Sequence, residues 1–254
     1  MISGTGTLRH CAVLALLLAF SATALARDEV DEDAIRIARN VATMLQSART
    51  VIAENQDLIN DPAATDKGLT GAFVLERAIE LFRRETETDP TTIDPASYEG
   101  RLMRAKMEAV VEVMDANQQT INAQGIGFKG FIPATFARLV TEAFGRRMGE
   151  EASIKVTAPP ELVRNRRARP DAWEEAAIRE YLQSTDWPRG QIYSGVETTE
   201  QGARVRIMVP EYYAPSCLAC HGGPKGEHDI TGYPKEGASE GDLGGVISIR
   251  LVPQ

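Results

Sequence analysis

Residues 210–242 form a long segment in which apolar residues do not recur at the spacing of a helix or a strand. The segment is rich in glycine and proline, and it connects two stretches with strand-like alternation. A connection of this length without secondary structure is unusual inside a compact domain. Because its side chains supply little apolar surface of their own, a bound apolar group is the simplest way to organise it.

The motif Cys217-Leu218-Ala219-Cys220-His221 lies inside this segment and indicates which group is bound. In a Cys-x-x-Cys-His motif the two thiols attach to a haem, and the adjacent histidine binds its iron. We therefore expect one haem c, attached covalently through Cys217 and Cys220. His221 is the expected proximal iron ligand.

Two other interpretations of the motif need features that the sequence lacks. A structural zinc site needs four ligands, and beyond residue 26 the only other histidine is His228. A redox-active Cys-x-x-Cys pair of the thioredoxin type lies at a strand-to-helix junction. Here Gly222-Gly223-Pro224 follows the motif and prevents a helix from continuing.

The first 26 residues have the three regions of a secretory signal peptide in order. Arg9 and His10 form a basic flank, residues 11–20 are apolar, and Ala24-Leu25-Ala26 is a small-residue cleavage sequence. The apolar run is shorter than the roughly 20 residues that a membrane-spanning helix needs. We expect cleavage after Ala26 and export, most simply to the periplasm.

Charge and hydropathy limit the classes of partner. The chain has 28 Lys and Arg against 36 Asp and Glu, a formal net charge of −8, and its one basic cluster spans residues 164–169. This balance argues against a nucleic-acid partner. No second apolar stretch is long enough to span a membrane. We expect a redox or sensor protein as partner, which the sequence does not identify, and oligomerisation stays open.

Apolar periodicity predicts helices first and strands later. Apolar residues recur every three or four positions, as in amphipathic helices, in residues 31–60, 73–84, 96–122 and 133–148. They alternate, as in half-buried strands, in residues 153–157, 191–198, 203–209 and 243–252. A short helix is expected at residues 171–182. This order predicts an α+β fold with an antiparallel sheet.

Several short motifs occur together in the second half of the chain. They are Arg164-Asn165, Pro170-Asp171-Ala172-Trp173-Glu174, Cys217 to His221 with Gly222, Tyr233-Pro234, Gly241-Asp242-Leu243 and Gly245-Val246-Ile247-Ser248. With them, residues 128–252 resemble the PAS-like c-type haem domain family of exported single-haem modules. The resemblance implies a PAS-like antiparallel sheet with packed helices, and a haem held by the long C-terminal loop. It implies electron transfer or redox sensing, without a settled catalytic activity.

On this basis the chain divides into three parts. Residues 1–26 are the expected signal peptide, residues 27–123 an N-terminal helical extension and residues 124–254 the PAS-like haem domain. The helices before residue 124 contribute little to the resemblance.

Four further residues are candidates for contact with the haem. Arg164, which matches the family stretch, and Asn165 are expected to contact the haem propionates or to anchor the loop, because guanidinium pairs well with carboxylate. A structural pair between an arginine and Asp171 is the alternative. Trp173 and Tyr233 can pack on the porphyrin, although packing in the protein core also explains them.

The second axial ligand of the iron is left open by the sequence. Some members of the resembled family use a cysteine on the approach to the helix that matches residues 133–148, but residues 124–131 contain none. Lys129 and His228 are the candidates, and their alternatives are an exposed turn lysine and a solvated loop histidine. Methionines on the helices are more typical of core packing. A vacant or water-filled site is the last alternative.

The distal ligand decides between functions. Two strong ligands are typical of an electron carrier or redox sensor, whose potential depends on ligand type and burial. An open site would bind nitric oxide, carbon monoxide or oxygen. A peroxidase-like enzyme needs a distal acid or base, for which only His228 is available. We therefore rank electron transfer or redox sensing first, gas sensing second and catalysis third, with no catalytic residue assigned.

Overall fold

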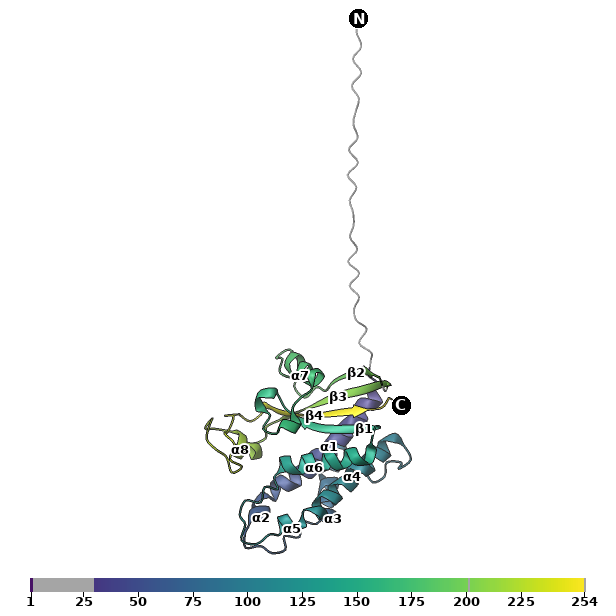
Figure 1. The fold of residues 1–254 in the computed structure, drawn as a ribbon. Coiled ribbons are helices and arrows are strands. Elements are labelled where there is room, and N and C mark those ends of the chain that lie inside the picture. The colour runs from purple at the N-terminus through teal and green to yellow at the C-terminus, as the bar shows by residue number, and fades with distance from the viewer. Residues whose placement is uncertain (2–29, 201, 254) are drawn as a thin grey trace.

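The computed structural model describes residue 1, residues 30–200 and residues 202–253, so the expected cleavage site at Ala26 lies outside the described residues. Four antiparallel strands form one sheet between two unequal helical layers (Figure 1). The strands are β1 (Ala152–Thr157), β2 (Tyr193–Thr199), β3 (Gly202–Tyr212) and β4 (Leu243–Leu251). The helices are α1 (Glu32–Glu54), α2 (Gln56–Asn60), α3 (Gly71–Thr86), α4 (Tyr98–Ala116), α5 (Gln118–Ile121), α6 (Pro133–Met148), α7 (Ala172–Ala177) and α8 (Leu218–His221). Short 3₁₀ or π-helical turns lie at Pro160–Leu162, Arg166–Ala168, Ile178–Leu182 and Pro215–Cys217.

Local signals explain where the long helices begin. The side chains of Asp31, Thr70 and Ser97 accept hydrogen bonds from the first turns of α1, α3 and α4, which satisfies amides that have no partner within the helix. Pro133 is the first residue of α6, where its missing N–H costs nothing. The helical segments expected from periodicity are therefore confirmed.

Two helices that the periodicity predicts as continuous are interrupted, each at an asparagine. The side-chain amide of Asn55 donates to the carbonyl of Val51 at 2.8 Å, and that of Asn117 donates to Val113 at 2.7 Å. An asparagine side chain that bonds to nearby backbone competes with the helical pattern. Residues 31–60 therefore form α1 and α2, and residues 96–122 form α4 and α5.

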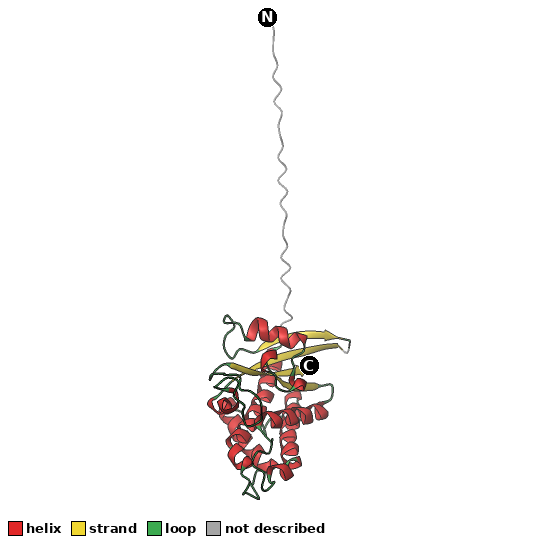
Figure 2. Cartoon of the chain, turned by 60° about the vertical axis from the view of Figure 1, so that its left-hand side comes forward, coloured by secondary structure: helices red, strands yellow, loops and turns green. Residues whose placement is uncertain are grey.

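The sheet has the strand order β1-β4-β3-β2 with every neighbouring pair antiparallel. Its two faces bury different residues. Ile207 and Ile249 belong to the core shared with the long helices, whereas Met208 and Val246 pack with Ile178 in a second cluster beneath α7. Figure 2 shows α7 on one side of the sheet and the long helices on the other. The strand alternation in the sequence thus corresponds to two buried faces.

The long helices and the sheet share one hydrophobic core. Leu45 of α1, Val110 of α4, Phe136 of α6, Ile207 of β3 and Ile249 of β4 are all completely buried and belong to the same cluster. The boundary expected between residues 123 and 124 therefore runs through a continuous core. No described helix has both the length and the apolar composition that a membrane span requires.

Lys106 of α4 is an unusual member of this core. Its side chain is completely buried, and its Nζ atom has no hydrogen-bond partner among the described residues. Nζ lies 4.5 Å from the centre of the Phe144 ring of α6. Burial lowers the pKa of Lys106 to about 7, because the charged amine loses its hydration.

Replacing this lysine should therefore stabilise the protein and flatten its pH dependence. In the unfolded chain a lysine has a pKa near ~10.4, so between about pH 7 and that value the unfolded state binds more protons. In this window Lys106 makes the free energy of unfolding rise with pH by up to about 1.4 kcal/mol per pH unit. Lys106→Met should abolish that rise and increase stability at pH 7, as measured by urea unfolding at pH 7 and pH 9. The exposed Lys225 provides the control Lys225→Met, and an unchanged slope in Lys106→Met would contradict the assignment.

Candidate haem-binding site

The last four residues of the Cys-x-x-Cys-His motif form the short helix α8 at one end of the sheet, and Cys217 ends the 3₁₀ turn before it (Figure 1). Cys217 and Cys220 are free thiols and are partly exposed. The helix ends at Gly222, whose amide donates to the carbonyl of Leu218 at 2.9 Å. A Cβ atom at position 222 would lie 2.6 Å from that carbonyl oxygen. The turn directly after His221 is therefore tight enough to require glycine.

The segment after the motif is ordered by its own backbone hydrogen bonds. The amide of Gly226 donates to Lys235 at 2.9 Å, and the amide of Asp229 donates to Tyr233 at 2.8 Å. The amide of Ala238 returns to the carbonyl of His221 at 2.9 Å. Residues 222–242 contain no helix or strand, as the lack of apolar periodicity predicts, and these backbone hydrogen bonds order the chain there. Glycine-rich turns let the chain pair with itself without an apolar core.

One nitrogen of His221 is held by the protein. Its Nδ1 atom lies 2.9 Å from Oε2 of Glu236 and 3.3 Å from the hydroxyl of Tyr213. The Tyr213 ring stacks on the imidazole with 4.9 Å between the ring centres. The hydrogen bonds of the described residues engage only Nδ1, so Nε2 is left for another ligand. A histidine fixed through one nitrogen and open at the other is typical of metal-binding histidines.

Arg164 connects the motif to the segment that follows it. Its guanidinium donates to both carboxylate oxygens of Glu236, at 2.8 and 2.9 Å. It also donates to Oδ2 of Asp229 at 2.6 Å and to the carbonyl of Cys220 at 2.9 Å. Tyr233, the other aromatic residue expected to contact the porphyrin, lies beside Arg164: its hydroxyl donates to the Arg164 carbonyl at 3.0 Å. Arg164 was expected either to contact the haem propionates or to anchor the loop. Its contacts with loop residues favour the anchoring role.

The charges of this network are fixed by their mutual contacts. Burial alone would raise the pKa values of Glu236 and Asp229, but hydrogen bonds from Arg164 and, for Asp229, from Thr231 lower both. Burial and the positive charge of Arg164 lower the pKa of His221. Burial, with the charge of Glu236, raises the pKa of Tyr213 to about 12. The result is a neutral imidazole, which is the form that binds a metal.

Helix α1 borders the site from the helical half of the chain. Arg49 of α1 forms a two-pronged ion pair with Glu211 of β3, and Gln46 donates to the same carboxylate at 3.2 Å. Burial would lower the pKa of Arg49, but the charge of Glu211 and the hydrogen bonds to it raise the pKa. The helical half therefore contacts the end of β3, the strand that leads to the motif.

Asn165 and Trp173 have contacts away from the motif. The Asn165 side chain accepts from the amide of Arg167 at 3.0 Å and begins the 3₁₀ turn Arg166–Ala168. The Trp173 ring packs on the guanidinium of the buried Arg206 and on Tyr193. Asp171 pairs with Arg206 at 2.7 Å and with Arg250 at 2.6 Å, so its partners are arginines of the strands and Arg164 has other partners. These contacts favour structural roles for Asn165 and Trp173.

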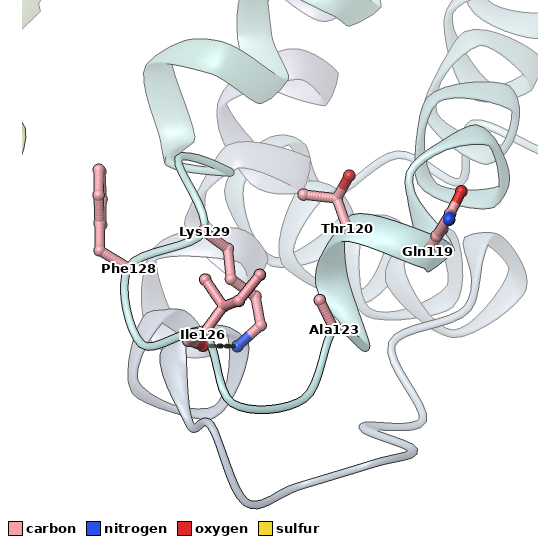
Figure 3. Close-up of a pocket in the computed structure, with 6 residues that line it drawn as sticks. All are labelled: Gln119, Thr120, Ala123, Ile126, Phe128 and Lys129. Carbon is pink, nitrogen blue, oxygen red and sulfur yellow. Dashed lines mark hydrogen bonds between the residues drawn. The ribbon is translucent and has the colours of Figure 1, made fainter.

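Lys129 lies in the turn before α6, beside a hollow of about 320 Å³ that is shown in Figure 3. Its amine donates to the carbonyls of Ile126 at 2.7 Å and Asp61 at 3.2 Å. These contacts hold the amine within the helical half and favour the role of a turn lysine over iron ligation.

His228, the other candidate for the distal ligand, is exposed, and its backbone pairs with Pro234 in the loop. Its position agrees with the alternative of a solvated loop histidine.

Sequence reasoning did not identify three residues of this site. Tyr213, Asp229 and Glu236 flank the motif in the chain, but nothing in their spacing distinguishes them from other polar loop residues. Acidic residues close in sequence after a haem motif are the only hint. The described residues contain no group of three or more His, Cys, Asp or Glu side chains arranged to hold a metal ion. Covalent haem attachment uses two thiols and one imidazole and needs no such group.

Comparison with known protein families shows to which family the chain belongs. Residues 27–252 match the model of the Tll0287-like family. No curated protein and no solved structure matches the chain. The family match indicates a haem-binding domain, and it includes the long helices as well as the sheet.

The contact between Tyr213 and His221 can be tested through Gly244 of β4. A Cβ atom at position 244 would lie 2.5 Å from the Tyr213 ring, so Gly244→Ala should push the ring away from the imidazole. Such overpacking costs about 1–3 kcal/mol, and we expect less covalent haem per polypeptide. The control Gly145→Ala in α6 meets no neighbouring atom within 4 Å. Urea unfolding and the haem absorbance of denatured protein measure the two effects, and equal behaviour of the two variants would refute the contact.

Proposed function

Because the chain belongs to the Tll0287-like family, we propose that it binds one haem c through Cys217 and Cys220, with His221 as proximal iron ligand. The observation that carries this proposal is the arrangement of α8. Two free thiols precede, in the same short segment, an imidazole whose Nδ1 is held by Glu236. The Nε2 atom is thereby left for the iron, and Tyr213 packs on the ring. The residues present therefore fit the group.

We propose electron transfer or redox sensing as the activity of this site. A bound haem would supply a one-electron couple between ferric and ferrous iron. The protein contributes the fixed imidazole, the charge of the Arg164 network and partial exposure of the motif. Cys217, Cys220 and His221 are each partly exposed, which would let a redox or sensor partner protein approach the site.

The finer features of this proposal concern fold and location. We propose that the sheet is PAS-like, which is supported by a helical connection from β1 to the β2-β3-β4 meander. Export is supported by the signal-peptide pattern in residues 1–26. We propose a periplasmic location, which is supported by this pattern and by the proposed covalent haem attachment, since such attachment takes place outside the cytoplasm.

Gas sensing is the second candidate, and one contact favours it. The amine of Lys129 is held by two backbone carbonyls, so the best nitrogen candidate for the distal side is already engaged. An iron without a strong distal ligand would bind carbon monoxide or nitric oxide. A peroxidase-like activity has less support, because His228, the candidate acid or base, is exposed in the loop.

Covalent attachment can be tested directly. The full chain is expressed with a c-type haem maturation system, and the intact mass and absorption spectrum of the purified protein are recorded. The wild-type protein should carry one haem that survives denaturation, and Cys217→Ser with Cys220→Ser should carry none. The matched histidine pair His221→Ala and His228→Ala should differ, with a changed spectrum only in His221→Ala. A colourless wild-type protein with the mass of the bare polypeptide would reject the proposal.

The distal side is tested by Lys129→Ala. Because the Lys129 amine is bonded to carbonyls, we expect its removal to leave the visible spectrum of the ferric and ferrous protein unchanged. Carbon monoxide added to the ferrous wild-type protein then separates the two functions. A shifted spectrum supports gas binding, and an unshifted one supports electron transfer. A spectrum that changes in Lys129→Ala would identify this lysine as a ligand.

A further inference from the structure

We propose that Glu236 is a positioning residue that increases the donor strength of His221 and thereby lowers the midpoint potential of the iron. This inference rests on the proposed function, since it concerns the proximal ligand of the proposed haem. It assigns to Glu236 a role that neither the motif nor the family match contains.

The geometry of the carboxylate carries the first step. Oε2 of Glu236 lies 2.9 Å from Nδ1 of His221, and the Glu236 side chain is only 16% exposed. When Nε2 binds a metal, Nδ1 carries the proton and donates a hydrogen bond to this oxygen. A carboxylate acceptor gives the imidazole more anionic character than a backbone carbonyl does. Glu236 therefore makes His221 a stronger electron donor.

The surrounding network keeps Glu236 ionised and correctly oriented. Arg164 donates to both of its oxygens, and the same guanidinium donates to Asp229, whose side chain is completely buried. A two-pronged arginine contact fixes the plane of a carboxylate. The carboxylate therefore presents one defined lone pair to Nδ1.

The charge balance fixes the direction of the effect. Arg164 contributes one positive charge, and Glu236 and Asp229 contribute two negative charges, so the network beside His221 has a net charge of −1. Ferric haem carries one more positive charge than ferrous haem. Both the net negative charge and the stronger imidazole donor stabilise the ferric form, which lowers the midpoint potential.

The test compares two carboxylates of the same loop. Glu236→Gln removes the charge and keeps the side-chain shape, whereas Glu227→Gln removes the same charge from an exposed side chain that pairs with Lys235 at 3.7 Å. Midpoint potentials of the haem-loaded proteins are measured by spectroelectrochemistry. Glu236→Gln should shift the ferric-to-ferrous equilibrium at least tenfold toward ferrous, which for one electron is about +59 mV. Glu227→Gln should shift it much less.

Two further measurements keep the outcome clear. If the ferrous iron is five-coordinate, the iron–histidine stretching frequency recorded by resonance Raman should fall in Glu236→Gln, because a weaker donor forms a weaker bond. If Glu236→Gln does not retain haem, Glu236→Asp, with a shorter carboxylate, should shift the potential in the same direction by less. Equal potentials in the Glu236 and Glu227 variants overturn the inference while the bound haem preserves the proposed function. A wild-type protein without haem overturns both.

Discussion

The contacts of a single guanidinium, that of Arg164, hold the candidate site together. Arg164 comes before the sheet meander in the chain, yet it bonds to Cys220, Asp229 and Glu236. Cys220 lies within the motif, Asp229 begins the turn at residues 229–233, and Glu236 follows this turn. Without a cation at this point, two largely buried carboxylates would face each other beside an imidazole, which is electrostatically unfavourable. The geometry of His221 therefore depends on a residue that is distant in sequence.

The fold gives this network a rigid base. Tyr213 follows the end of β3, and β4 begins directly after the loop, so both ends of the haem segment are attached to neighbouring central strands. The same two strands bury Ile207 and Ile249 in the core that α1, α4 and α6 share. Arg49 of α1 reaches Glu211 near the end of β3. The long helices thus support the end of the sheet from which the motif extends, which gives a physical reason why the family match covers them as well.

Most secondary structure followed from local rules. Apolar periodicity predicted the long helices and the four strands, because burial on one face imposes those spacings regardless of partners. The interruptions at Asn55 and Asn117 were missed, since whether an asparagine breaks a helix depends on where its amide can bond. Of the two roles expected for Trp173, its packing on Arg206 and Tyr193 favours a place in the protein core. That pairing depends on strand register, which the periodicity does not specify.

The sequence by itself determined the motif on which the proposed haem attachment rests. Cys217, Cys220 and His221 are adjacent in the chain, and two thiols with a neighbouring imidazole form a haem motif whatever surrounds them. Only the tertiary structure decided how that imidazole is held and charged. Glu236, Asp229, Tyr213 and Arg164 meet at His221 because the loop folds back on itself and the sheet brings Arg164 beside it. Electrostatic contacts depend on the distance between groups in space, and separation along the chain does not determine that distance.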